Sequence, residues 1–171
     1  MLERIVQRFL RIVRFDATVY REIQQDERAT SEAAVVVVAA SLLAALGEGL
    51  NSPGFVAGFI VEFLAGILLY WLLWSWITIL VGTRVFGSHA TYLQVARSLG
   101  YANGLRALSI LSILGCIFGP LVGLAAWALS LIIGVIAVRE AMELSTERAI
   151  VTATVGWVVV VIARALLGIV V

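Results

Sequence analysis

The sequence predicts an all-α membrane protein: a polytopic bundle of five transmembrane helices with an amphipathic interfacial helix at its N-terminus. Two observations predict this class. First, 62% of the 171 residues are apolar and only 13% are charged, whereas soluble domains average about 45 to 50% and about 25%. Second, the apolar residues form five long runs that a soluble core of this size could not bury. We therefore expect lipid to surround most of the chain.

The lengths of the apolar runs define the expected spans, because a helix needs about 20 residues to cross about 30 Å of hydrocarbon. Residues 1–32 are expected to form a polar cytoplasmic segment, and residues 33–171 one membrane domain. Its spans are expected at about 33–50, 55–82, 101–118, 121–138 and 149–171. The third span must begin near Leu99 or Tyr101, which places Arg106 where its stem snorkels to the headgroups.

Only Gly119-Pro120 separates the third run from the fourth. Proline has no amide donor and bars the preceding residue from helical geometry, so this dipeptide predicts a tight hairpin. The alternative is a re-entrant hairpin that enters and leaves the membrane on one side. Both arrangements leave the sidedness of the other spans unchanged.

The arginines predict the orientation, since cytoplasmic loops carry an excess of basic residues. With a cytoplasmic N-terminus, eleven of the twelve basic residues, all arginines, lie in the cytoplasmic segments 1–32, about 83–106 and 139–148. The twelfth, Arg164, lies inside the fifth run. We therefore expect a multi-pass protein of the cell membrane with its N-terminus inside and its C-terminus outside.

The first residues predict an amphipathic helix in the membrane interface. At about 100° per residue, one side is apolar and holds Leu2, Ile5, Val6, Phe9, Leu10, Ile12 and Val13. The other side carries four arginines that we expect to contact anionic headgroups of the lipid bilayer: Arg4, Arg8, Arg11 and Arg14. A more acidic helix is expected from Asp16 to about Arg28, and a second membrane-surface helix over Thr91 to Gly100.

Glu62 and Arg164 are the two charged residues that this scheme places inside the membrane. A charge in hydrocarbon costs roughly 2.5 to 3.5 kcal/mol by insertion scales, so each marks a candidate site. Both lie about 10 Å below the outer face at about 1.5 Å per residue, which places them to form an ion pair. The alternative is that Arg164 snorkels outward while Glu62 is protonated or reaches the interface.

Small residues recur at four-residue spacing around the third and fourth runs, and this spacing lets helix backbones approach closely in lipid. We expect it to serve packing within one chain, with the face of a homo-oligomer as the alternative. The residues are Gly115, Gly123, Ala126, Ser130 and Gly134. Trp71, Trp74 and Trp76 are expected to form an interface belt or to pack between helices.

The chemistry-bearing residues are few. One cysteine, Cys116, and one histidine, His89, exclude a disulfide framework and a Cys/His zinc site. We expect His89 to be a solvated loop residue. The sequence therefore predicts no enzyme activity, no catalytic residues, no metal, no cofactor and no nucleic-acid partner.

Three elements together resemble the Yip1 family of five-span membrane proteins, in particular its small prokaryotic members. They are Leu99-Gly100-Tyr101, the Gly119-Pro120 break, and Trp127 to Glu140 with the sequence Ala-Val-Arg-Glu-Ala at its end. The resemblance covers roughly residues 16–171. Eukaryotic members are associated with Golgi and endoplasmic-reticulum traffic and with prenylated small GTPases. Because only thirty-two residues precede the first run here, GTPase binding is not carried over.

Two functions are consistent with these features. The first is a non-enzymatic membrane-organising, scaffold or trafficking-type protein that acts on lipid, on a second copy of itself or on an unknown membrane partner. The alternative is a small transporter or channel subunit, which needs a polar path. For such a path the sequence offers only Glu62, Arg164 and scattered Ser and Thr, so the first function is favoured.

Overall fold

A computed structural model describes residues 1–49, 54–114 and 118–166, with the side chains of 48–49, 112–114, 118–120, 122–124 and 127 left out of the description. Every regular element in these ranges is a helix. In chain order they are α1 Leu2–Val13, α2 Thr18–Gln25, α3 Ala29–Gly49, α4 Phe55–Ile67, the π-helix η1 Leu68–Leu73, α5 Trp74–Arg84, α6 Tyr92–Ala102, the 3₁₀-helix η2 Asn103–Leu114, α7 Phe118–Met142 and α8 Thr146–Leu166. The all-helical class is thus confirmed.

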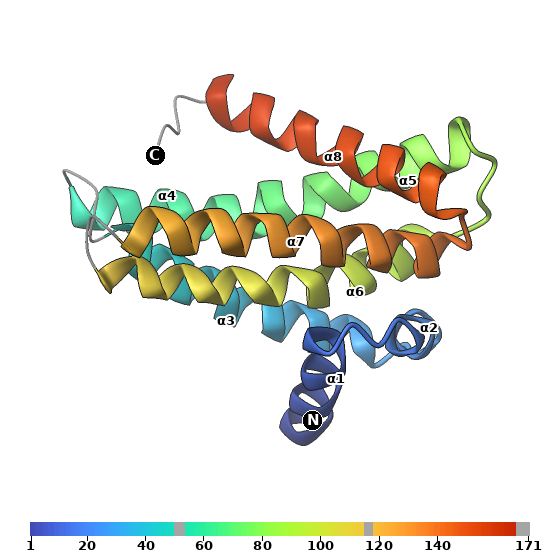
Figure 1. Cartoon of the computed structure of the whole chain (residues 1–171), viewed down its shortest axis with the longest axis horizontal. Helices are drawn as coiled ribbons and strands as arrows, with labels where there is room; N and C mark the ends of the chain where they lie inside the picture. Colours follow the sequence, from blue (N-terminus) through green and yellow to red (C-terminus); the bar gives the residue numbers. More distant parts are fainter. Residues whose placement is uncertain (50–53, 115–117, 167–171) are drawn as a thin grey trace.

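The long helices lie side by side along the longest axis of the molecule, whereas α1 lies crosswise to them (Figure 1). α3 packs against α4 and η2, and α7 packs against η2, α6 and α8. The end of α3, the start of α4, the end of η2 and the start of α7 share one end of the bundle (Figure 1). The end of α5, the start of α6 and the turn between α7 and α8 share the other, near α2.

Three of the described helices are long and apolar enough to cross a membrane: Ala29–Gly47, Phe55–Arg84 and Thr146–Leu166. They correspond to the first, second and fifth expected spans. The third and fourth spans stay predictions, but η2 bears on the length of the third. A 3₁₀-helix rises about 2.0 Å per residue, so the 12 residues of η2 extend about 24 Å instead of the about 18 Å of an α-helix.

The helix expected over Thr91 to Gly100 is present as α6, but its expected place at the membrane surface is wrong, because α6 lies inside the bundle. All its residues from Val95 to Ala102 are buried, and it packs against α2, α3, α5 and α7. Its one charged side chain, Arg97, donates to Thr30 Oγ1 at 2.6 Å and to the Gln24 carbonyl at 3.0 Å. Burial is tolerated because this guanidinium finds acceptors within the chain.

The expected turn at Gly119-Pro120 is also wrong, since both residues belong to the first turn of α7. Proline is tolerated there because the first amides of a helix have no intrahelical acceptor. Gly115 and Cys116 fall outside the described residues. The acidic helix α2 ends at Gln25, before the expected Arg28.

Trp74 holds α5, α7 and α8 together in the bundle. Its indole is buried and donates to the Ala153 carbonyl at 3.1 Å. A Cβ added at Gly134 or at Gly156 would lie 2.7 Å from the ring, so both positions require glycine for this close approach. Gly134 therefore packs within its own chain. Ala126 is buried, Ser130 is half-buried, and Gly123 is placed only as part of α7.

Candidate functional site: two buried ionic clusters

The first candidate site, here called the intramembrane cluster, consists of Glu62, Tyr70, Arg106 and Arg164. Glu62 in α4 is only 3% exposed. Arg164 Nη2 of α8 lies 3.0 Å from Glu62 Oε2, and Arg106 Nη2 of η2 donates to Glu62 Oε1. One buried carboxylate therefore lies between two guanidinium groups from two other helices.

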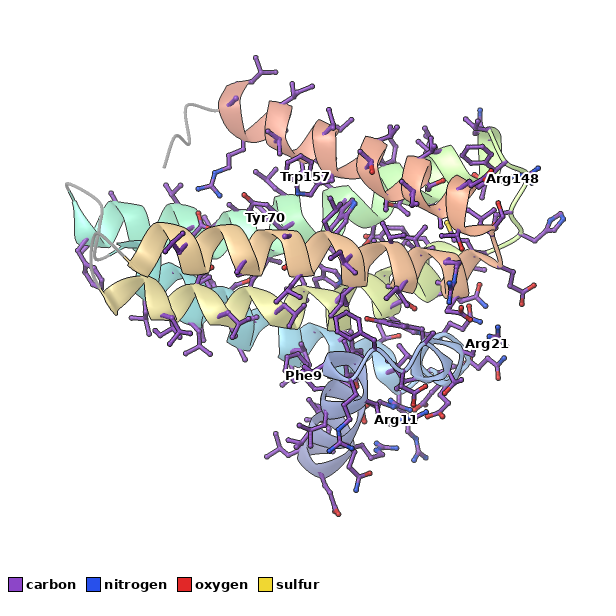
Figure 2. All side chains as sticks on the ribbon, viewed as in Figure 1. Phe9, Arg11, Arg21, Tyr70, Arg148 and Trp157 are labelled. Atoms are coloured by element: carbon purple, nitrogen blue, oxygen red, sulfur yellow. The ribbon has the colours of Figure 1, made fainter. Side chains whose placement is uncertain are left out.

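Tyr70 completes this cluster near the middle of the bundle's length (Figure 2). Its hydroxyl accepts from Arg164 Nη1 at 2.5 Å. Its ring centroid lies 4.1 Å from Cζ of Arg106 and 5.7 Å from Cζ of Arg164, within the range of cation–π attraction. Its carbonyl accepts from Asn103 Nδ2 at 2.7 Å. We call a long helix, or a run of helices that follow one another without a break, a helical rod. The second rod consists of α4, η1 and α5, and its π-helix η1 connects it to α8 and to the rod formed by α6 and η2.

The sequence placed Glu62 and Arg164 at similar depth, and the structure brings them together. It placed Arg106 one or two turns inside the third span, with its stem snorkelling to the headgroups. The snorkelling is wrong, because this guanidinium faces the bundle interior and contacts Glu62. The Glu62 carboxylate and the Tyr70 ring provide favourable contacts for the positive charge, which a snorkelling arginine would obtain from water and headgroups. The absence of a side chain at Gly66 makes space for this guanidinium, since a Cβ there would lie 2.8 Å from Arg106 Nη1. Arg106 Nη1 itself is buried and has no hydrogen-bond partner among the described residues.

The second candidate site, the Glu32 cluster, consists of Arg4, Arg8, Asp26, Glu32 and Tyr101. Glu32 in the first turn of α3 is fully buried. Its Oε2 accepts from Arg8 Nη1 at 2.6 Å and from the Tyr101 hydroxyl at 2.7 Å. Its Oε1 lies 2.8 Å from Arg4 Nη2, an ion pair without hydrogen-bond geometry. Arg8 also donates to Asp26 Oδ2 at 2.7 Å. The cluster fastens α1 to α3, to α6 and to the turn after α2.

Three of the four arginines expected at anionic headgroups are thus in ion pairs with this chain's own carboxylates. Besides Arg4 and Arg8, Arg11 donates to Asp16 at 2.8 Å and to Glu22 at 2.8 and 2.9 Å. Arg14 is exposed. The contact with anionic lipid stays a prediction. Sequence reasoning missed the acidic partners, although the five carboxylates from position 16 to position 32 were a signal that internal pairing was available.

These contacts keep the paired groups charged. Burial works to lower the pKa of Arg8, but its hydrogen bonds, first of all to Asp26, outweigh this and raise it. The same bond holds the pKa of Asp26 below its ordinary value. Hydrogen bonds from Thr18 and then Arg11 lower the pKa of Asp16. The Arg8–Asp26 and Arg11–Asp16 ion pairs therefore persist at neutral pH.

Neither cluster has the arrangement of an acid, a base and a nucleophile that catalysis requires. Within the described residues no three His, Cys, Asp or Glu side chains are placed to hold a metal ion. A cavity of about 380 Å³ opens at the bundle end near α2, and His89 and Ser88 are among its lining residues. Ser88 Oγ donates to the Met142 carbonyl at 3.0 Å, and His89 is exposed.

Residues 11–167 match the Yip1 domain family. The chain belongs to the Yip1 family. The resemblance drawn from the sequence is confirmed, and the match covers nearly the whole chain. No curated protein and no solved structure shows a significant match to it. Together with its long apolar helices, family membership makes the chain a membrane-embedded protein of the Yip1 type, a family known as non-enzymatic membrane proteins.

Proposed function

We propose that this Yip1-family chain is a non-enzymatic membrane-organising protein whose five helical rods cross the cell membrane, with its N-terminus in the cytoplasm and its C-terminus outside. The arrangement of the rods supports five full crossings, because η2 and α7 reach the same end of the bundle as the facing ends of α3 and α4 (Figure 1). The arginines of α1, α2 and the loops near α2 support the orientation.

The Glu32 cluster is the observation that carries this proposal. It fixes a crosswise helix, α1, to the first expected span through Glu32 and to α6 through Tyr101. A buried carboxylate held by two arginines and a tyrosine makes this attachment rigid and specific. A helix held at a set angle to the spans is suited to act on the lipid or on a partner at one membrane face.

A small transporter or channel subunit is the second candidate, and the intramembrane cluster favours it, because ionisable residues within spans mark ion pathways. Against it, the cluster's strong contacts join one helix to another. Glu62, Arg106 and Arg164 belong to three different rods, and both arginines bind Glu62. Their first effect is to hold the bundle together.

Reconstitution into liposomes tests the two candidates. With increasing protein-to-lipid ratio, we expect vesicle diameter to change by electron microscopy, while ion flux stays at the level of empty liposomes. The matched control is Glu32→Gln, which keeps the volume of the side chain but removes the charge that holds Arg8. Flux that depends on the protein and is lost in Glu62→Gln, with no change in vesicle shape, would contradict the proposal and support the transporter.

Single cysteines test the orientation in a Cys116→Ser background. Ser52→Cys, which precedes α4 in the sequence, should react with an impermeant thiol reagent added outside intact cells. His89→Cys, in the exposed loop before α6, should react only after permeabilisation. Equal labelling of both positions from outside would be incompatible with the proposed topology.

A further inference from the structure

Helix α1 has three distinct faces. Its basic face, with Arg4, Arg8 and Arg11, is engaged by carboxylates. A second face packs on the bundle through Ile5 and Ile12, which are buried, and through Phe9, whose ring would lie 2.6 Å from a Cβ added at Gly104. The third face, here called the apolar stripe, has four exposed side chains: Leu2 70%, Val6 54%, Leu10 51% and Val13 46%.

The apolar stripe is continuous and has no cover within the described chain. Its members follow one another at four- and three-residue spacing, so they form one row on the helix surface. Four aliphatic side chains half exposed in a row mark a surface that contacts something apolar. Phe15, two residues after the end of the helix, is also exposed.

The direction of the stripe indicates what covers it. α1 lies crosswise to the spans (Figure 1), which makes it parallel to the membrane plane if the spans cross the membrane. Arg11 and Phe9 point to opposite sides of α1, with Arg11 toward α2 and the bundle end beside it (Figure 2). At about 100° per residue, Leu2, Val6 and Val13 lie about 140 to 180° from Arg11, and Leu10 lies about 100° from it. The stripe therefore faces away from the bundle end near α2 and toward the part of the bundle that the hydrocarbon surrounds.

The charge around α1 argues against attraction to anionic headgroups as the main force. Arg8 is shared by Asp26 and Glu32, and Arg11 by Asp16 and Glu22. Ion pairs of this kind present little net positive field beyond their immediate surroundings. Burial of apolar surface is then the force that remains, and it does not depend on headgroup charge.

We propose that the apolar stripe of α1 inserts among the acyl chains of the cytoplasmic leaflet independently of anionic lipid, with the Glu32 cluster holding the helix at that depth. This rests on the proposed function, because it names the lipid tails of one leaflet as the partner on which the fixed helix acts. An inserted helix takes up area in one leaflet only, which is how a fixed surface helix changes membrane shape.

Fluorescence quenching in the full-length protein tests the insertion. A Cys116→Ser protein carrying Val6→Cys or, as the matched control, Gln7→Cys is labelled with an environment-sensitive fluorophore and placed in lipid nanodiscs. Gln7 is the exposed neighbour on the polar side of the helix. With brominated acyl chains, the Val6 probe should be quenched about threefold more than the Gln7 probe. This ratio should be the same in zwitterionic and in anionic discs, and at about 1 M salt.

Three results would overturn the inference: no quenching at Val6 in either lipid, quenching in anionic discs alone, or disulfide cross-links between Val6→Cys chains that would assign the stripe to a second copy. A Glu32→Gln variant adds a test of the anchor. It should reduce the difference between the two probes, because α1 then tilts freely at the surface, and an unchanged difference would remove the anchoring role.

The outcome separates this inference from the proposed function. Quenching at Val6 without any change of vesicle shape would leave the insertion standing and contradict a membrane-organising role. A change of vesicle shape without quenching at Val6 would contradict the insertion alone.

Discussion

The two ionic clusters use the same residue types in different surroundings. Each has one buried glutamate, two arginines and one tyrosine. In the Glu32 cluster the tyrosine donates its hydroxyl proton to the carboxylate, whereas Tyr70 of the intramembrane cluster accepts from an arginine and offers its ring face to both. The arginines of the Glu32 cluster come from a helix outside the expected spans.

The difference concerns what each arginine does without its glutamate. Arg4 is nearly half exposed and Arg8 keeps Asp26 as a second acid, so both retain favourable contacts without Glu32. Arg106 and Arg164 have Tyr70 beside them, and they lie within a bundle that we expect to be surrounded by lipid. The same set of residue types therefore forms a removable anchor for α1 in one cluster and a structural requirement between the long helices in the other.

The largest expected effect follows from removing Glu62. Glu62→Leu deprives two buried guanidinium groups of their shared carboxylate, and we expect a loss of about 3 to 5 kcal/mol in the free energy of unfolding. Thermal unfolding in detergent measures it. The double variant with Arg164→Leu should lose less than the sum of the single changes, because the survivor of each single change is left without its partner.

Two further double-mutant cycles with Glu62→Leu serve as comparisons, one with Arg106 and one with Arg84. Glu62→Leu with Arg106→Leu should show coupling of the same sign, whereas Glu62→Leu with Arg84→Leu, an exposed arginine at the end of α5, should be additive. Additive effects for both cluster pairs would contradict the interaction of these charges.

A smaller effect is expected at Glu32. Glu32→Gln keeps the side-chain volume and should cost about 1 to 3 kcal/mol, because Arg8 and Tyr101 lose a charged acceptor while Asp26 still binds Arg8. The comparison predicts a local signature that Glu62→Leu lacks. Hydrogen exchange should speed up in the amides of α1 much more than in those of α8. Uniform acceleration across all helices would show that Glu32 is as central to the bundle as Glu62.

The two tyrosines sharpen the comparison further. Tyr101→Phe removes a donor to a buried carboxylate and should cost about 1 to 2 kcal/mol. Tyr70→Phe removes an acceptor for Arg164 but keeps the ring face that both arginines contact, so it should cost about 1 kcal/mol or less. Tyr70→Leu, which removes the ring as well, should cost clearly more than Tyr70→Phe. Equal losses for the two Tyr70 variants would mean that the ring face contributes nothing.

Acid should loosen α1 by a small amount. The pKa of Asp26 is lowered by Arg8 and that of Asp16 by Thr18 and Arg11. The stabilisation from these groups is therefore fully present above their unfolded-state pKa of about 3.9 and is lost as the pH falls below it. Hydrogen exchange of α1 across this range should show the loss. Asp26→Asn should remove part of the pH dependence, and an unchanged profile would contradict the role of Asp26.

The sequence was informative about Glu62 and Arg164 because each is a charge within an apolar run, where few arrangements avoid a large desolvation cost. It was misleading about Arg106, which lies near the start of its run and was assigned to the headgroups. Only the packing of η2 against the rods that carry Glu62 and Tyr70 turns Arg106 inward. Periodicity along one helix contains no information about which neighbour that helix faces.

The Glu32 cluster was missed for a related reason. Glu32 is the last residue of the polar segment, directly before the first apolar run, and this position in the sequence gives no sign that its side chain is buried. Its burial results from α6, which contributes Tyr101 from sixty-nine positions away. The surface position expected for the helix over Thr91 to Gly100 was wrong for the same reason. Arg97 is buried because it donates to Thr30 and Gln24, and no local sequence pattern indicates these distant acceptors.

Composition and run length by themselves determined that this chain is helical and embedded in a membrane, because backbone groups in hydrocarbon must bond within their own segment. The family was also readable from short local motifs. Only the tertiary structure decided which charges meet, that Arg4, Arg8 and Arg11 of α1 pair with carboxylates of the same chain, and that an apolar stripe of α1 stays exposed. The physical reason is that the solvent selects helices through their average composition, whereas ion pairs depend on distances of a few ångströms between residues far apart in the chain.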